Sequence, residues 1–366
     1  MRRVLTKIAW VSDLTWEEEQ SLRLSIAQGG CGIISACTTQ VFSHLASACQ
    51  YMPAVEQFLL NLGWRRDQVE MAINWDGVHQ CLSQLQNRQI YVDVDGNVHR
   101  VVVAHLLTTK SILWGKSRKI FRPLMDALQG DQCKALNDAY GRDRTIVAER
   151  QKARLKSCSG PAAGKWLDAF PSSWWPKFSD EAFVMALRFR GGIPVGRSGL
   201  GCQHERCNGE GPCGKSLDIY GDHCIVCGIG GHLFTRHGAV NNVLMEAGRS
   251  AGYAVLSEQV IPAFARVKVR EDATCAITDG RIDVELFGHA YAPDHLLDGT
   301  VRHPGAASVV RVAAREVGHA AEEGAKVKRK RYPTKFGKAI LPCSMETWGF
   351  LGKPLEALLE ELLKPC

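Results

Sequence analysis

Apolar side chains recur with a helical period along much of this chain, which predicts helices there rather than strands. The predicted helices cover residues 1–60 with a break at 27–33, 105–155, 179–190, 239–253, 309–332 and 353–364. Ser179 is the expected N-cap of the third helix, because a serine side chain can accept a hydrogen bond from the first turn. The last helix places its leucines on one face, which predicts that this face packs on a core.

Alternating apolar and polar residues predict strands between some of these helices. Residues 89–103 favour a hairpin around an Asp95-Gly96 turn. Residues 281–289 alternate clearly, and residues 296–301 form a second candidate strand. The pattern therefore predicts an α+β protein whose N-terminal half is mostly helical.

The composition is that of an ordinary globular protein, with 45% hydrophobic and 23% charged residues in a chain of 366. Two or three domains are expected at this length. No apolar run approaches the roughly 18 residues of a membrane helix, and the start of the chain does not fit a secretory signal. We therefore expect an intracellular protein with no membrane segment.

The net charge is +7, and the most basic stretch, residues 326–338, contains no acidic residue. Such a run is typical of a solvated face, of a phosphate-binding surface or of a nuclear-targeting signal. A nuclear location is therefore one expectation. The candidates for contact with nucleic-acid phosphates are Lys328, Arg329, Lys330, Arg331 and Lys335.

Fourteen cysteines are a high count, and without a secretory signal they favour metal binding over a disulfide framework. The stretch CNGEGPCGKSLDIYGDHCIVCGIGGHLFTRH, residues 207–237, holds four of them together with three histidines. Zinc binds four sulfur or nitrogen ligands in a tetrahedron, and glycine-rich turns let a short segment supply all four.

Cys213, His223 and Cys227 are suitably spaced as zinc ligands, and Cys207 is the best fourth ligand. Four protein ligands leave no open position, so this zinc would be structural. The competitors for the fourth place are Cys202, Cys224 and His237. One alternative is a set of free cysteines around a buried histidine. A redox pair of Cys224 and Cys227 fits less well, because the surrounding pattern is not that of a redox fold.

Three carboxylates follow the cysteine-rich stretch: Glu258, Asp283 and Asp298. Each aspartate lies in a predicted strand between apolar residues, where a charge is costly unless a cation compensates it. Converging carboxylates would bind Mg²⁺, which polarises a phosphodiester and activates a water molecule. Lys326 or Lys328 on the following helix would offset the developing negative charge.

A structural role for these acids is the alternative, in which they cap strands or pair with Arg281 and Arg302. The spacing of the three carboxylates does not by itself decide between this role and metal binding.

Three blocks of sequence occur in a distinctive order. Residues 22–47 contain LRLSIAQGGCGIISA and FSHLASA, and residues 155–194 contain LKSCSGPAAGKWLDAFP and FSDEAFVMALRFRGGIP. Residues 213–349 contain, in order, CGKSLDIYGDHCIVC, RH, SEQ, RIDV, LDGTVRHP, KVKRKRY and ETWG. Together they resemble the C-terminal part of a non-LTR retrotransposon polyprotein: the segment after the reverse-transcriptase palm, a connector, and a zinc knuckle with a restriction-endonuclease-like domain.

The resemblance implies an α+β multidomain protein with a helical remnant at 1–70, a hairpin and helical connector at 71–195, a zinc knuckle at 196–240 and an α/β restriction-endonuclease-like (PD-(D/E)XK) domain at 241–366. It implies zinc ligands at Cys207, Cys213, His223 and Cys227. It also implies metal-binding carboxylates at Asp283 and Asp298, a helix-side carboxylate at Glu258 and a displaced lysine at Lys326 or Lys328. The palm itself is absent, so no polymerase activity is expected.

The leading hypothesis is therefore a retrotransposon-derived, Mg²⁺-dependent endonuclease that carries structural Zn²⁺ and nicks DNA, with RNA as a further partner. The second hypothesis is an inactive, zinc-containing remnant that binds nucleic acid. The third is a zinc-stabilised interaction protein. Binding that weakens as salt rises would separate the first two from the third.

Overall fold

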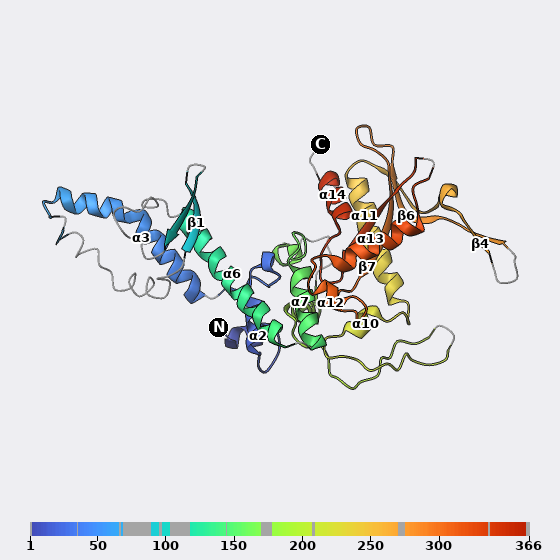
Figure 1. Ribbon diagram of the computed structural model, residues 1–366, viewed down its shortest axis with the longest axis horizontal. Helices are drawn as coiled ribbons and strands as arrows, with labels where there is room; N and C mark the ends of the chain where they lie inside the picture. The colour runs from blue at the N-terminus through green and yellow to red at the C-terminus, as the bar shows by residue number, and fades with distance from the viewer. Residues whose placement is uncertain are drawn as a thin grey trace. The chain divides into compact units, whose positions relative to one another are not determined.

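The chain is a mixed α/β protein (Figure 1). It divides into two compact units, one comprising Arg23–Ser25 and Gly32–Asp138, the other Arg2–Leu22, Ile26–Cys31 and Ala139–Cys366. The computed structural model describes residues 2–34, 36–65, 67–68, 89–94, 97–102, 118–143, 145–169, 178–206, 209–269, 275–335 and 337–363. Among the described helices, none combines the length and the apolar character needed to cross a membrane.

The first unit contains α3 (Ala36–Asn61), a two-stranded hairpin and most of α6 (Arg118–Arg142). The hairpin pairs β1 (Gln89–Val94) with β2 (Asn97–Val102) in antiparallel register, which confirms the predicted hairpin. The predicted turn residues between these strands lie outside the described residues, and so does the start of the helix predicted at 105–155.

The second unit begins with short helices that surround a buried arginine. These elements are α1 (Arg2–Ile8), α2 (Trp16–Arg23), η1 (Ile26–Gln28), α7 (Ile146–Cys158), α8 (Lys165–Asp168), α9 (Asp180–Gly191) and α10 (Asp222–Val226). Ser179 accepts a hydrogen bond from the backbone N–H of Ala182, which confirms the predicted N-cap of α9. Arg190, only 3% exposed, donates to the carbonyls of Gly30 and Ala163, so the break predicted at 27–33 is held in place.

A four-stranded mixed sheet forms the C-terminal part of the second unit, in the order β3-β6-β7-β8. The strands are β3 (Ala254–Val260), β6 (Arg281–Phe287), β7 (His295–Arg302) and β8 (Ile340–Glu346). β6 is antiparallel to both β3 and β7, whereas β7 and β8 are parallel. A hairpin of β4 (Arg266–Val269) and β5 (Cys275–Thr278) is inserted between β3 and β6. Pro342 lies in β8, where an edge strand tolerates a residue without an N–H donor.

Helices cover both faces of this sheet. On one face lie α11 (His232–Ser250) and α14 (Lys353–Leu362), whose Leu244, Leu355 and Leu358 form one core with sheet residues such as Val284 and Leu297. On the other face α13 (His319–Arg331) packs on β7 and β8. The alternation predicted at 281–289 is confirmed, because Ile282, Val284 and Leu286 are all buried.

The helix predicted at 309–332 is two helices, α12 (Val310–Ala313) and α13. Gly318, with φ of +72°, precedes α13 in a left-handed conformation that interrupts a continuous helix. The buried carboxylate of Glu346 then accepts hydrogen bonds from the N–H groups of Ala320 and Ala321 at the start of α13. α13 is thereby fixed at one end, while its basic C-terminal end lies beside the sheet.

Candidate functional site

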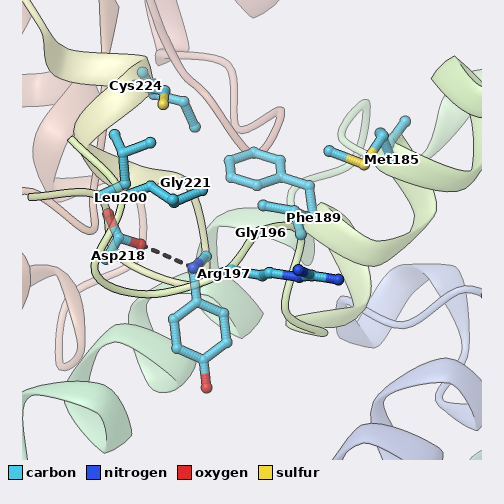
Figure 2. Close-up of a pocket in the computed structure, with 13 residues that line it drawn as sticks. Met185, Phe189, Gly196, Arg197, Leu200, Asp218, Gly221 and Cys224 are labelled. Carbon is cyan, nitrogen blue, oxygen red and sulfur yellow. Dashed lines mark hydrogen bonds between the residues drawn. The ribbon is translucent and has the colours of Figure 1, made fainter. Parts of the chain in front are cut away.

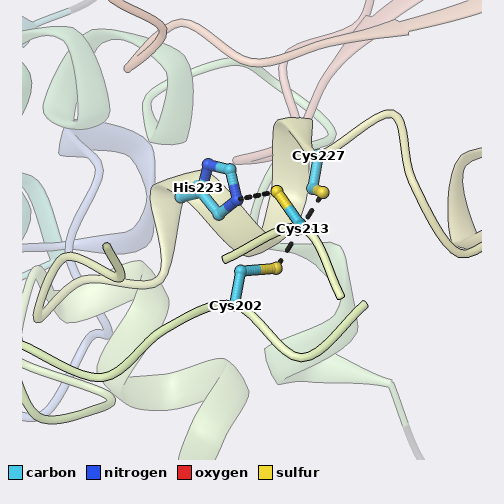
Figure 3. Close-up of side chains that lie close together, drawn as sticks. All are labelled: Cys202, Cys213, His223 and Cys227. Carbon is cyan, nitrogen blue, oxygen red and sulfur yellow. Dashed lines mark hydrogen bonds between the residues drawn. The ribbon is translucent and has the colours of Figure 1, made fainter. Parts of the chain in front are cut away.

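Three cysteines and one histidine meet beside α10 (Figure 3). Two of them, Cys202 and Cys213, come from a small loop whose two arms pair through Cys202 N–H to Lys215 O (2.8 Å) and Cys213 N–H to His204 O (2.8 Å). The other two, His223 and Cys227, begin and end a single helical turn. The four side chains therefore converge because a paired loop and one turn of helix face each other.

The four ligand atoms all lie within 4.8 Å of one another. The Sγ atoms of Cys202 and Cys227 are 3.9 Å apart, and Cys213 Sγ lies 3.6 Å from His223 Nε2. A tetrahedral zinc with sulfur ligands at about 2.3 Å requires separations of roughly 3.8 Å. A hydrogen bond from the backbone N–H of Lys215 lowers the pKa of the Cys213 thiol, which favours the thiolate that binds metal. This cluster could bind a metal such as zinc.

Cys202 supplies the fourth ligand atom of this cluster, in the place for which Cys207 was the preferred residue and Cys202 a competitor. Cys207 lies outside the described residues. Cys213, His223 and Cys227 come together as predicted. The spacing alone did not separate the two cysteines, because the pairing that places Cys202 opposite Cys213 is a tertiary feature.

The turn of α10 is held to α7 by an ion pair with a buried arginine, and to the end of β7 by a histidine. Arg150 donates two hydrogen bonds to the carboxylate of Asp222, at 2.5 and 2.7 Å, and His303 Nε2 lies 3.2 Å from the same carboxylate. Burial alone would raise the pKa of Asp222, but hydrogen bonds from His303 and Arg150 lower it overall. Since His303 directly follows β7, the metal cluster and the central sheet share a structural link.

Asp283 and Asp298 face each other where β6 and β7 separate. The paired residues of these strands run from Leu286↔His295 to Val284↔Leu297, and the two aspartates come next at the open end. Their carboxyl groups lie within hydrogen-bonding reach of each other. Two carboxyl groups so close share protons or a cation, because two adjacent buried negative charges repel.

Asp283 is held by groups from α11 and β7. His237 Nε2 lies 3.1 Å from Asp283 Oδ1, Asn241 Nδ2 lies 3.3 Å from the same ring nitrogen, and the N–H of Gly299 donates to Asp283 Oδ2 at 2.6 Å. Burial alone would raise the pKa of Asp283, but the contact with His237 lowers it overall. The same contact raises the pKa of His237.

Asp298 is 1% exposed and forms an ion pair with Lys328 of α13. Burial, and then the nearby carboxyl of Asp283, raise the pKa of Asp298 to about 7, although Lys328 opposes this rise. Oδ2 of Asp298 is buried and receives no hydrogen bond from the described groups. The pair therefore offers an unsatisfied oxygen to a proton or a cation.

Gly299 allows this close arrangement. A Cβ atom at this position would lie 2.9 Å from Asn241 Oδ1 and 3.4 Å from both Asp283 Oδ2 and the ring of His237. A cavity of about 210 Å³ opens beside it, lined by Arg236, His237 and Lys328 among others. His237 and Lys328 line this cavity and contact Asp283 and Asp298, and we call the cavity together with these two aspartates the acidic cleft.

The side chains of Glu258 and Lys326 pair with residues other than these two aspartates. Glu258 is in β3 rather than beside a helix, with a left-handed φ of +55°, and its exposed carboxylate is 3.5 Å from Arg281. Lys326 pairs with Glu323 on the exposed side of α13. Of the two candidate lysines, Lys328 therefore reaches the aspartates, because its side chain lies on the face of α13 that packs on the sheet.

The predicted basic surface is exposed along the end of α13 and beyond it. Arg329 pairs with Glu322, and the guanidinium of Arg331 lies 5.1 Å from the centre of the Tyr332 ring. The side chains of Lys330 and Lys335 are exposed. These positions leave cationic groups in solvent next to the cleft that Lys328 enters.

Sequence reasoning missed two residues of the acidic cleft, His237 and Asn241. His237 was considered only as a spare zinc ligand, since it closes the cysteine-rich stretch. The two residues are four apart and share one face of α11, but the helix predicted at 239–253 began after His237, so this spacing was not recognised. That spacing brings His237 to Asp283 and Asn241 to His237.

No protein-family model matches the chain, and no curated protein matches it either.

Proposed function

We propose that the second unit is a metal-dependent endonuclease that nicks DNA, held together in part by a structural zinc. The observation that carries this proposal is the meeting of Asp283, Asp298 and Lys328 at the open end of β6 and β7. The sequence resemblance to the endonuclease part of non-LTR retrotransposons agrees with it. A mixed sheet with helices on both faces is also compatible with the restriction-endonuclease-like domain that the resemblance implies.

The residues of the cleft fit a magnesium ion. Asp283 and Asp298 offer carboxylate oxygens, which Mg²⁺ prefers, and Asp298 Oδ2 is buried without a hydrogen bond from described groups. When bound, the ion would polarise the scissile phosphate and lower the pKa of the attacking water. Asp298 must lose its proton before it can serve as a ligand.

The other groups of the cleft would bind and orient the phosphodiester. Lys328 and Arg236 line the cavity and can offset negative charge that develops on the phosphate oxygens. His237 and the N–H of Gly299 hold the Asp283 carboxylate in one orientation. The exposed cations that follow on α13 would contact phosphates further along the strand, which gives affinity without reading sequence.

A plasmid-nicking assay with Mg²⁺ tests the proposal. Asp283→Ala and Asp298→Ala should each lower the nicking rate by at least about 100-fold, because each removes a carboxylate from the cleft. Lys328→Ala should lower it by about the same factor, whereas Lys326→Ala, two residues away and exposed, should leave it unchanged. Equal nicking by the wild type and both aspartate variants would refute the assignment.

A second candidate function, nucleic-acid binding without cleavage, is favoured by one observation. Lys328 already forms an ion pair with Asp298, so a metal ion would have to compete with it. Under this alternative, DNA binding persists without Mg²⁺. The wild type then shows no measurable nicking, so no variant can change its rate. A protein with no salt-dependent binding to DNA or RNA would instead be an interaction module.

A further inference from the structure

A second cavity, of about 430 Å³, lies between α9 and the loop that carries the cysteine cluster (Figure 2). Its volume is within the range of sites for small organic groups, roughly 300–1,000 Å³. The lining is largely apolar, from α9 and from the chain around α10: Met185, Ala186, Phe189, Val195, Leu200, Leu217 and Ile225. The acidic cleft has a different set of lining residues.

The walls of this cavity are held in place. Val195 and Gly196 both donate backbone hydrogen bonds to the carbonyl of Ile219, at 2.8 and 3.0 Å, and Leu217 donates to Leu200 O at 2.8 Å. These bonds join the segment after α9 to the loop before α10. The cavity is therefore largely preformed, which reduces the cost of ordering it around a ligand.

An aromatic ring forms one wall and is supported from behind. Phe189 packs against Trp348 with ring centres 5.6 Å apart, and against His303 at 6.4 Å. Its remaining surface lines the cavity, where Figure 2 shows the ring beside Gly196. A fixed aromatic ring suits a flat, apolar group that can stack or pack on it.

Two charged residues, Arg197 and Asp218, also line this cavity. Asp218 accepts hydrogen bonds from the N–H groups of Tyr220, Asp222 and His223, so its charge is largely satisfied. Arg197 is exposed and has no hydrogen-bond or ion-pair partner among the described residues. The cavity thus combines an apolar interior with one uncompensated cation, which calls for a ligand that is flat, apolar and attached to an anion.

We propose that this cavity binds an unpaired nucleobase of a single-stranded segment, with the adjoining phosphate at Arg197. A nucleotide combines a planar ring with a phosphate, which matches both the Phe189 wall and the free guanidinium. Met185 and Leu200, 44% and 57% exposed, form an apolar rim through which a base can enter. The inference rests on the proposed nucleic-acid function but concerns a different site, and it predicts that single-stranded segments are part of the substrate.

The test compares binding of two labelled single strands, a deoxythymidine 10-mer and a 10-mer of abasic residues with the same phosphates. The protein is the full-length Asp298→Asn variant in buffer without Mg²⁺ or chelator, so cleavage does not interfere. We expect the base-bearing strand to bind at least about tenfold more tightly, since stacking contributes roughly 1–3 kcal/mol per base. Met185→Glu should abolish this preference and leave binding of the abasic strand nearly unchanged.

Val243→Glu is the matched control, because it introduces the same charge at an apolar residue that is 55% exposed on α11 and outside the cavity. It should retain the preference for bases. Arg197→Ala should weaken both strands, because it removes a phosphate contact. Unchanged thermal unfolding of the variants shows that their fold is intact.

Equal binding of the two strands, or a preference that survives Met185→Glu, would overturn this inference and leave an apolar protein segment as the alternative occupant. Neither result would affect the nuclease proposal, which depends on nicking. Conversely, if the wild type does not nick DNA but prefers the base-bearing strand, the nuclease proposal is refuted and the base-binding cavity is retained.

Discussion

At the residue scale, the acidic cleft contains a carboxyl group that the fold makes costly to ionise. Asp298 is almost fully buried, lies next to Asp283 and has one cation, Lys328, as its partner. Burial and the neighbouring carboxyl group outweigh that cation, so the pKa of Asp298 is raised to about 7. Perturbed groups of this kind are concentrated at functional sites, where they are retained at the expense of stability.

Asp298→Asn should change how stability depends on pH. The folded state keeps a proton on Asp298 to about pH 7, while the unfolded chain releases it near pH 4. Between these values the folded state binds more protons, so this group's contribution to stability falls as pH rises. The wild type should lose roughly 2–3 kcal/mol relative to the variant between pH 5 and pH 8.

Urea unfolding of both proteins at the two pH values measures this difference. Asp283 does not produce the same trend, because its pKa is lowered and its effect falls below about pH 4. Parallel changes in the wild type and the variant would contradict a raised pKa for Asp298.

Gly299→Ala should damage the cleft without unfolding the protein. The new Cβ would press on Asn241 Oδ1 at 2.9 Å, so the Asn241 amide that contacts His237 must shift, and it would touch Asp283 Oδ2 at 3.4 Å. We expect nicking to fall by at least about tenfold, since small displacements of a reacting group are costly. Gly238→Ala is the control: a Cβ there meets nothing within 4 Å, and alanine favours the helix. Loss of nicking in both variants would argue against a specific role for Gly299.

At the element scale, one turn of helix connects the cysteine cluster to the central sheet. α10 carries the metal-ligand candidate His223, with Cys227 as its C-cap, and the Asp222 carboxylate, which binds Arg150 of α7 and lies 3.2 Å from His303 at the end of β7. Removal of one partner from such a buried pair leaves an unpaired charge, which costs about 3–5 kcal/mol. The geometry of the cluster and that of the sheet are therefore expected to depend on each other.

The metal content of cysteine variants distinguishes the two candidates for the fourth ligand. The purified protein should contain about one zinc per chain by elemental analysis, because the cluster supplies four ligands and no more are needed. Cys202→Ser should lose most of this zinc and unfold at lower temperature, since metal binding contributes to folding. Cys207→Ser and Cys224→Ser should keep it. Retention by Cys202→Ser with loss by Cys207→Ser would assign the site to Cys207 instead.

In the four-stranded sheet, the strands that could be predicted were the two central ones. β6 and β7 carry alternating or apolar runs, so the sequence located both aspartates in strands. β3 and β8 were missed: β3 is mostly exposed and follows a helix directly, and β8 contains Pro342 and small residues. Their strand character comes from pairing with β6 and β7, which are distant in sequence.

The residues that form the acidic cleft could also be predicted only in part, because some of them meet through contacts between segments that are distant in sequence. Asp283, Asp298 and Lys328 could be proposed from burial, charge and order along the chain. The placement of His237 against Asp283 depends on how α11 packs on the sheet, and the two residues are 46 positions apart. The direction of the Glu258 side chain could not be predicted from sequence, because its left-handed backbone conformation and its pairing with Arg281 are visible only in three dimensions.

At the scale of the whole molecule, the charge is unevenly distributed. The net charge is only +7, yet the segment from Lys326 to Lys338 contains seven basic residues and no acidic one. One of them enters the cleft, and most of the others remain in solvent at the end of α13 and in the segment after it. Such a local cationic surface beside two carboxyl groups would suit the polyanionic substrate of the proposed nuclease, because the cations would hold the phosphates while the carboxylates would hold the metal ion.

DNA affinity should therefore depend on salt through this surface and not through net charge. Each lysine that contacts a phosphate contributes about 0.9 to the slope of log K against log salt concentration. Lys330→Ala with Lys335→Ala should lower the slope for duplex DNA by about 2, measured by fluorescence anisotropy over a range of potassium concentrations. The double variant Lys7→Ala with Lys134→Ala removes the same charge from exposed positions elsewhere and should leave the slope unchanged. If the two double variants lower the slope equally, then DNA binding depends on overall charge. That result would contradict a specific contact between the end of α13 and DNA phosphates.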